Sequence, residues 1–231
     1  MGLLAAGVRL LSAYVGAARA VLGQLRVDAK TNEHKAALRL LGVLPLAGKV
    51  VTGDAVFTHR DVAAAIRQAG ADYVLVVKDN QPELKAPIEQ ALHGGQDFSP
   101  HQRRRKAEAE EEARSTDKGH GRREYRRLCG TTLLRGYLDW PDAARVFEPE
   151  RVRVPPGETE VEVVHGVTSL RRGRADAAAL LGLVRGHWGI ENGLHDVGDE
   201  TLGRTAAGCA GGTGRGCWRR CARRRCTWWG R

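Results

Sequence analysis

The amino-acid sequence predicts an α/β fold, because apolar runs typical of buried strands alternate with segments of helical periodicity. The clearest strand candidates are Lys49–Ala55 and Tyr73–Lys78, and a continuous apolar run indicates a strand covered on both faces of its sheet. A helical pattern follows each of them, at Arg60–Gln68 and after Pro82. The 231 residues, 42% hydrophobic and 28% charged, have the balance of an ordinary globular protein.

The segment that precedes these strands continues the same alternation. Two strands are predicted at Leu10–Val15 and Val21–Val27, joined by a turn that contains Gly and Ala. Asn32 is a suitable N-cap for a helix that reaches Leu41. Residues 1–93 are therefore expected to form the first part of the α/β core.

Residues 94–173 have a different pattern. From Gly94 to about Lys118 the chain is polar and highly charged, which predicts a loop or a solvated helix that links two regions. Three strand-like runs come next, at Arg123–Leu128, Ala144–Val154 and Glu160–Leu170. We therefore expect a charged linker followed by a β-rich insertion.

A long helix is predicted at Ala175–His195, and residues 174–203 are expected to complete the core. Its apolar side chains recur at helical spacing, at Leu180, Leu181, Val184 and Trp188. The sequence contains no run of about 18 uncharged apolar residues, so we expect no membrane partner.

Residues 204–231 differ in composition from the rest of the chain. They contain eight of the 37 basic residues and none of the 27 acidic ones, so the remainder is nearly neutral despite the net charge of +10. Four of the five cysteines lie here without a CxxC pair, which disfavours a zinc-dependent binding module. If Cys217–Cys221 is written with GC-rich codons and read two bases later, it encodes Leu-Ala-Ala-Leu, an apolar pattern typical of a helix. We therefore expect 204–231 to be out-of-frame sequence and disordered.

Asp54 is the first candidate for chemistry, because it ends an otherwise apolar strand. The carboxyl ends of strands in an α/β sheet are the usual positions for ligands and metals. The alternative is a structural aspartate that caps a helix or a turn, and the spacing leaves both open.

A row of polar residues follows on the predicted long helix. His187, Glu191, His195 and Asp199 are spaced four residues apart, so they project from nearly one face. Such a row can bind a divalent cation or line a groove for phosphates. The alternative is a solvated polar stripe.

The third candidate is the basic segment around Gly119 and Gly121. Its cations can reach a phosphate backbone, and the two glycines favour a tight turn. The alternative is a solvated surface turn. The candidate contacts are Lys118, His120, Arg122 and Arg123.

The order of these features resembles the DDE transposases of bacterial insertion sequences, and most closely their H-repeat-associated branch. The resemblance covers roughly residues 9–203. The matching stretches are VDAKTNE (27–33), VVTGDAVFTHRDV (50–62), GADYVLVVKDNQPEL (70–84), DKGHGRREYR (117–126), YLDWP (137–141), HGVTSLRRGRADAAALL (165–181) and RGHWGIENGLH (185–195).

The resemblance implies a ribonuclease-H-like core with a β-rich insertion before the last catalytic helix. It also implies three carboxylates that hold two divalent cations, Mg²⁺ or alternatively Mn²⁺. Asp54 matches the second aspartate of the family and Glu191 its glutamate, so both are expected to be catalytic metal ligands. Supporting residues are Asn192, His195 and Asp199. The expected DNA-binding residues are Lys118, His120, Arg122, Arg123, Arg185 and His187.

One departure from the family bears on activity. The family's first aspartate lies on a first strand before the one that matches Leu10–Val15, and we expect that strand to be missing here. Only Asp28 and Glu33 precede Asp54 among the acidic residues. The resemblance thus predicts an insertion-sequence transposase, in an inactive copy, that binds the element ends in the bacterial cytoplasm at the nucleoid. A homodimer is expected if the chain folds. The alternative is a non-catalytic DNA-binding remnant.

Overall fold

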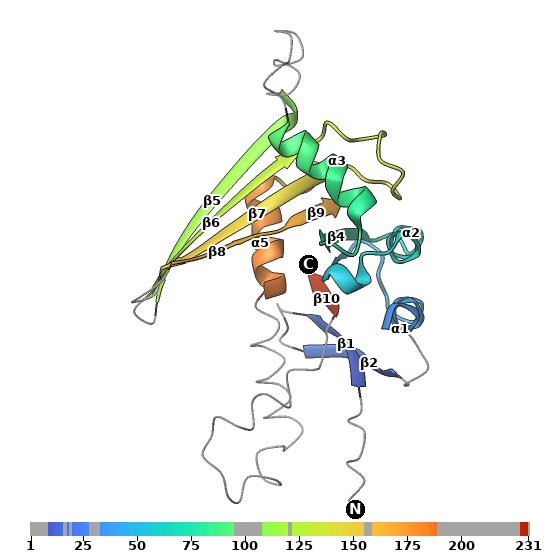
Figure 1. Ribbon diagram of the computed structural model, residues 1–231. Coiled ribbons are helices and arrows are strands. Elements are labelled where there is room, and N and C mark those ends of the chain that lie inside the picture. The colour runs from blue at the N-terminus through green and yellow to red at the C-terminus, as the bar shows by residue number, and fades with distance from the viewer. Residues whose placement is uncertain are drawn as a thin grey trace, which may run out of the picture.

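The computed structural model describes residues 9–15, 18, 20–27, 33–94, 108–119, 122–154, 159–188 and 227–230. Within these residues a ten-stranded mixed sheet runs through the molecule, with helices on both of its faces (Figure 1). The strand order is β2-β1-β10-β3-β4-β9-β7-β6-β5, and β8 pairs with β7. This arrangement confirms the predicted α/β class.

The first part of the chain supplies a hairpin and a parallel pair of strands. β1 (Arg9–Val15) and β2 (Ala20–Val27) are antiparallel, and α1 (Glu33–Leu41) follows them. β3 (Val50–Gly53) and β4 (Asp72–Val77) are parallel. The connection between them consists of a 3₁₀ turn, η1 (Ala55–Phe57), and α2 (Arg60–Gln68). All of these strands and α-helices lie where the sequence predicts them.

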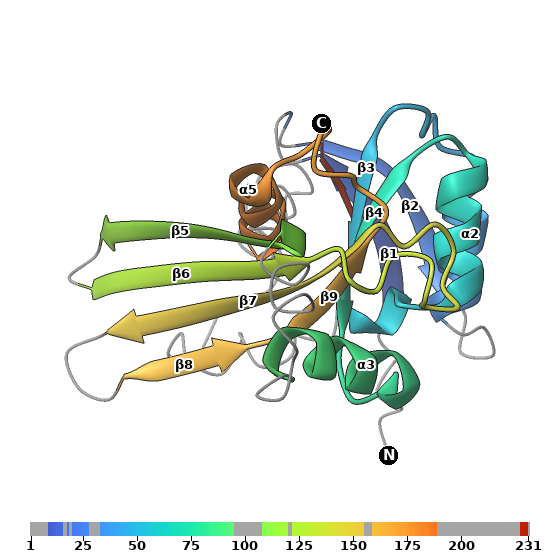
Figure 2. The same cartoon turned by 90° about the horizontal axis from the view of Figure 1, so that it is seen from above.

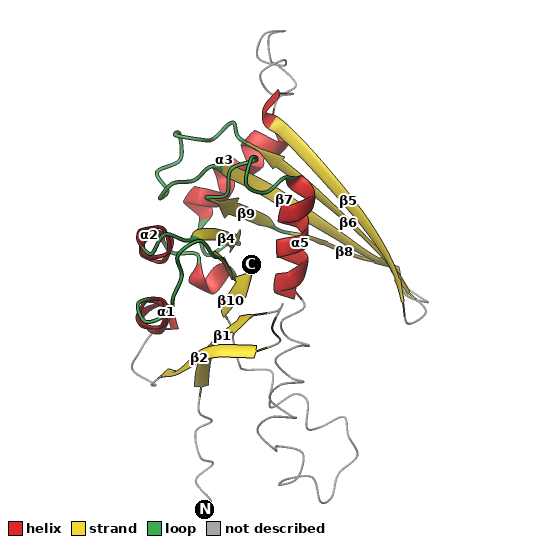
Figure 3. Cartoon of the chain, turned by 180° about the vertical axis from the view of Figure 1, so that it is seen from behind, coloured by secondary structure: helices red, strands yellow, loops and turns green. Residues whose placement is uncertain are grey.

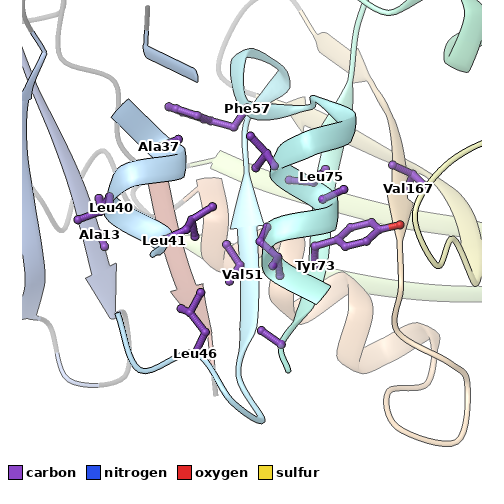
Figure 4. Packing of buried hydrophobic residues seen from close by; sticks show 14 of the residues in the cluster. Ala13, Ala37, Leu40, Leu41, Leu46, Val51, Phe57, Tyr73, Leu75 and Val167 are labelled. Atoms are coloured by element: carbon purple, nitrogen blue, oxygen red, sulfur yellow. The ribbon is translucent and has the colours of Figure 1, made fainter. Parts of the chain in front are cut away.

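Side chains of β3 and β4 alternate between two hydrophobic cores, one on each face of the sheet. Val51, Tyr73 and Leu75 pack with α1, α2 and α3 (Pro82–His93), as Figure 4 shows for several of these residues. Val50 and Val74 pack on the other face against α5 (Ala177–Trp188). Figures 2 and 3 show α3 and α5 on opposite faces. Both faces are covered, which explains why these strands are mainly apolar.

The second half of the chain extends the same sheet with antiparallel strands. β5 (Glu110–Gly119) pairs with β6 (Arg122–Thr131), and β6 pairs with β7 (Arg145–Val154). β7 pairs with β8 (Glu160–Val163) and with β9 (His165–Thr168). β9 also pairs with β4, so the predicted β-rich region is continuous with the core sheet. The run predicted at Glu160–Leu170 as one strand forms two.

The charged segment between Gly94 and Lys118, predicted to be a loop or a solvated helix, contains β5. This prediction was wrong because ion pairs, rather than apolar side chains, attach β5 to its neighbours. Glu111 pairs with Arg145 at 2.8 Å, and Asp117 pairs with Arg126. A segment made mainly of charged and polar residues lacks the apolar periodicity by which strands are recognised in a sequence.

Four residues of the segment predicted to be disordered form a strand. β10 (Thr227–Gly230) lies between β1 and β3, parallel to the former and antiparallel to the latter. Its backbone pairs with the facing edges of β1 and β3, whose N–H and C=O groups require partners inside a sheet. The disorder prediction is therefore wrong for residues 227–230, and the rest of 204–231 lies outside the described residues.

Candidate active site

Asp54 lies at the carboxyl end of β3, in the interior of the sheet. β3 is flanked by β10 and β4, and all four of its residues are buried. The Asp54 carboxylate itself is 44% exposed. The predicted central position of this strand is confirmed, and the acid stands at the sheet edge where α/β proteins bind ligands.

Lys78 is the charged neighbour of Asp54. β3 and β4 are parallel, so their carboxyl ends meet at the same edge, and Lys78 directly follows β4. Its Nζ lies 3.5 Å from Oδ1 of Asp54, with both side chains about half exposed. An ammonium group beside an acid at a strand end offers one contact for a cation and another for a phosphate.

The turn after Asp54 shows whether this residue is a structural aspartate that caps a helix or a turn. Asp54 occupies the position before η1, but within the described residues its side chain makes no capping hydrogen bond. The carboxylate is therefore available to a ligand. The turn is held from the next loop, where Asn80 Nδ2 donates to the Ala55 carbonyl at 2.8 Å and Gln81 Nε2 donates to the Thr58 carbonyl at 2.9 Å.

Sequence reasoning did not select Lys78, Asn80 or Gln81 as site residues. They lie in one of the stretches that carry the family resemblance, immediately after an apolar strand. Their position after β4 could have identified them, because the turns that follow two adjacent parallel strands lie next to each other, and Asp54 follows β3.

His187 connects α5 to the Asp54 strand. Its Nδ1 lies 3.2 Å from Oγ1 of Thr52, which is two residues before Asp54. Burial lowers the pKa of His187 to about 4; the negative charge of Asp54 opposes this shift and the positive charge of Lys78 adds to it. His187 is therefore neutral at pH 7 and interacts electrostatically with both charged residues.

The predicted metal ligand Glu191 lies outside the described residues, as do Asn192, His195, Asp199 and His120. The expected approach of Glu191 to Asp54 thus stays a prediction. The structure places the last described turn of α5 against β3 through His187, and Glu191 follows four residues later.

The predicted DNA-binding residues that the structure describes lie in two places. Lys118 and Arg123 are exposed and face each other across the β5–β6 ladder, where Arg122 pairs with Gly119. Arg185 Nη2 lies 2.8 Å from Oδ2 of Asp117 on β5. Arg185 is thus directed to the β5–β6 hairpin, whereas His187 is directed to Thr52 on β3.

Asp117 joins α5 to this hairpin through an ion pair with Arg185. A hydrogen bond from Arg126 lowers the pKa of Asp117, and the charge of Arg185 lowers it further. Asp117 is therefore ionised at neutral pH and is shared between two arginines.

None of the helices in the described part of the chain has the length and apolarity to cross a membrane.

The model of the transposase DDE domain family matches residues 5–214. YbfL from Escherichia coli K12 is 29% identical over 198 residues, which are 81% of this chain and 49% of YbfL. YhhI from the same strain, named as a candidate H repeat-associated transposase, has the same identity and coverage. YncI from Escherichia coli O157:H7, named as a candidate transposase, is 26% identical over 87% of this chain and 50% of YncI.

The chain spans about half the length of the curated relatives it matches. No solved structure matches it. The mixed α/β architecture is consistent with the ribonuclease-H-like core that the resemblance implied.

Proposed function

This chain belongs to the transposase DDE domain family, and from this membership we propose that it is an insertion-sequence transposase. Its fold would serve the metal-dependent cleavage and transfer of DNA strands at the ends of a mobile element. The observation that carries the proposal is the position of Asp54, exposed at the end of a buried central strand against which α5 packs.

Asp54 and Glu191 are the proposed ligands of divalent cations. Oxygen ligands suit Mg²⁺, which we propose as the ion, with Mn²⁺ as a substitute. The exposed Asp54 carboxylate, with no capping role, fits a cation ligand. A pair of such ions activates the attacking oxygen and stabilises the leaving oxygen at a phosphodiester.

The neighbouring residues would position the ligand and the DNA. Asn80 and Gln81 hold the turn that contains Asp54, so the carboxylate keeps its orientation. Lys78 offsets the charge of an incoming phosphate. Neutral His187 aligns α5 on β3 without adding a positive charge that would repel a metal ion.

The β5–β6 hairpin is the proposed contact for the DNA backbone. Lys118 and Arg123 are exposed there, and the backbone of Arg122 pairs with Gly119 on β5. His120, which lies outside the described residues, is proposed as a further contact. Cations placed in this way bind phosphates without reading the base sequence. We propose that the protein acts on DNA in the bacterial cytoplasm, at the nucleoid, and as a homodimer.

We further propose that the 231-residue chain binds DNA but does not cut it. A two-ion site of this family takes three carboxylates, and only Asp54 and Glu191 match in this sequence. A chain that binds DNA without cutting it corresponds to the second candidate function, a non-catalytic DNA-binding remnant.

Strand cleavage of a duplex that carries the element's ends tests the activity, first with Mg²⁺ and then with Mn²⁺. We expect no cleavage from this chain. Cleavage that is lost in an Asp54→Ala variant would contradict the proposed inactivity and would support Asp54 as a ligand. Cleavage that persists in Asp54→Ala would contradict the proposed active site.

DNA binding is tested separately by fluorescence anisotropy over a range of salt concentrations. The Arg122→Glu variant is expected to bind specific and random duplexes more weakly by the same factor, with a salt slope smaller by about 1 per lost phosphate contact. The matched control is Arg171→Glu, which changes an exposed arginine before α5. Equal affinity and slope in Arg122→Glu and the wild type would exclude the hairpin contact.

A further inference from the structure

Two histidines and a glutamate meet where the end of α3 lies over β7 and β9. Oε2 of Glu148 is 2.6 Å from Nε2 of His93 and 3.0 Å from Nε2 of His165. One ligand atom from each residue lies within 4.8 Å of the other two. In tetrahedral zinc sites, with bonds of about 2.0–2.2 Å, neighbouring ligand atoms are roughly 3.3 Å apart. The three side chains are therefore close to the spacing that one ion requires.

The sheet directs two of these side chains to the α3 face. Val146 and Val167 belong to the core under α1, α2 and α3. Side chains alternate along a strand, so Glu148 and His165, each two residues from one of these valines, point to the same face. α3 then supplies His93 from its last turn.

His165 is the residue whose environment points to a missing ligand. It is only 8% exposed, and its Nε2 finds no hydrogen-bond partner among the described residues. The approach of Glu148 is close enough for charge attraction but is not aligned as a hydrogen bond. A buried polar nitrogen that lacks a partner costs about 1–3 kcal/mol, which a metal–nitrogen bond would offset.

The other ring nitrogen of His165 faces a second carboxylate. Oε1 of Glu89, one helical turn before His93 on α3, lies 4.0 Å from Nδ1 of His165. In metal sites, a ligating histidine commonly donates its second N–H to a carboxylate, which fixes the tautomer and directs the other lone pair to the metal. Glu89 is placed to do this for Nε2.

We propose that His93, Glu148 and His165 form a zinc site with one coordination position open to solvent. Two imidazoles and one carboxylate are a ligand set that binds Zn²⁺, whereas Mg²⁺ prefers an all-oxygen shell. The site shares no residue with the Asp54 region, since β9 is separated from β3 by β4, or about 10 Å at the usual strand spacing. The bound ion ties the end of α3 to the antiparallel half of the sheet.

A second group of possible ligands makes a useful comparison. His34, His59 and Asp61 also lie within 4.8 Å of one another. There, Nε2 of His34 is hydrogen bonded to Asp61 at 2.5 Å, much as Nε2 of His93 is to Glu148. Unlike His165, neither histidine of this second group has a buried ring nitrogen that lacks a partner among the described residues. This group therefore serves as the control.

The test is titration of the purified full chain with Zn²⁺ and with Co²⁺, after its thiols have been alkylated. With millimolar Mg²⁺ present to occupy the proposed Asp54 site, we expect one Zn²⁺ or Co²⁺ ion per chain and a Co²⁺ spectrum of nitrogen and oxygen ligation. Loss of a residue that only supports a metal ligand weakens metal binding by about 10–100-fold. His93→Gln and His165→Gln remove a ligand itself, so we expect them to weaken Zn²⁺ binding by at least about 100-fold. His34→Gln should bind as the wild type does.

His93 keeps the test decisive, because its side chain is 60% exposed at a helix end and its replacement should not impair folding. Circular dichroism of each variant confirms that the fold is retained. Zn²⁺ should raise the melting temperature of the wild type but not of His93→Gln. The proposal is wrong if the wild type does not bind Zn²⁺, or if folded His93→Gln binds it with unchanged affinity.

Discussion

Oγ1 of Thr52 lies 3.2 Å from Nδ1 of His187, across 135 residues of sequence. This contact joins the central strand that ends at Asp54 to the last described turn of α5. Thr52 is buried and belongs to a strand with no exposed residue, so the bond forms in a site that water does not reach freely. It is the structural link between the two halves of the candidate active site.

Thr52→Val tests that link, because it removes the hydroxyl with little change of shape. His187 Nδ1 then loses its partner, and leaving a partly buried polar atom unpaired costs about 1–3 kcal/mol. We expect urea unfolding to show a loss of stability in this range. Thr116→Val, on the exposed side of β5, is the control and should change stability by less than about 0.5 kcal/mol. Equal stabilities for the two variants would contradict the assigned contact.

His187 should make stability depend on pH between about 6.5 and 4. Its pKa is lowered to about 4 in the folded protein, from 6.5 in the unfolded chain. In this window the unfolded chain binds the proton and the folded protein does not, so stability falls as the pH falls. The full effect is at most about 3 kcal/mol.

The measurement for His187 is the free energy of unfolding of wild type and His187→Asn at several pH values. Above pH 7 the free energy of unfolding should change with pH by the same amount in the wild type and in His187→Asn. Between pH 6.5 and 4 the wild type should lose more stability on acidification than the variant does. Parallel curves through this window would show that His187 titrates normally.

The buried ion pair that holds β5 predicts a large mutational effect. Arg145 is fully buried; its Nη1 donates to Glu111 at 2.8 Å and its Nε donates to the Leu170 carbonyl at 2.7 Å. Glu111→Ala leaves a buried guanidinium without its counter-charge and should cost about 3–5 kcal/mol in chemical unfolding. Glu160→Ala, which removes an exposed partner of Arg153 on β8, should cost about 0–1 kcal/mol. Similar costs would mean that β5 is held in another way.

Lys78 should weaken the binding of a metal ion and strengthen the binding of DNA. Lys78→Gln removes the positive charge 3.5 Å from Asp54, so Mn²⁺ should bind more tightly, by up to about 5-fold, the size of an exposed ion pair. The same variant should bind duplex DNA more weakly, because one phosphate contact is lost. Isothermal titration calorimetry and anisotropy measure the two affinities. Lys85→Gln on α3 is the control, and a change of the same sign in both affinities would contradict this role.

Much of the fold follows from local patterns in the sequence. β3, α2 and β4 are predictable because apolar β-branched runs and helical spacing act over a few residues. The position of Asp54 at a strand end follows from the same runs. β5 was not predictable in this way, since its charges become a strand only when Arg126 and Arg145 are opposite them.

For the candidate site too, local sequence predicted some features and the tertiary structure was needed for others. Asp54, Glu191 and the basic turn follow from residue type, spacing and family resemblance, and the distance from Asp54 to Glu191 stays a prediction. The contacts of Asp54 with Lys78 and of Thr52 with His187 required the tertiary structure. Strand order and helix docking decide which distant residues become neighbours. Both depend on which helices cover the two hydrophobic faces of the sheet. The sequence by itself therefore determined which residues could perform the chemistry, and only the packing of α5 and β4 against β3 decided which of them meet.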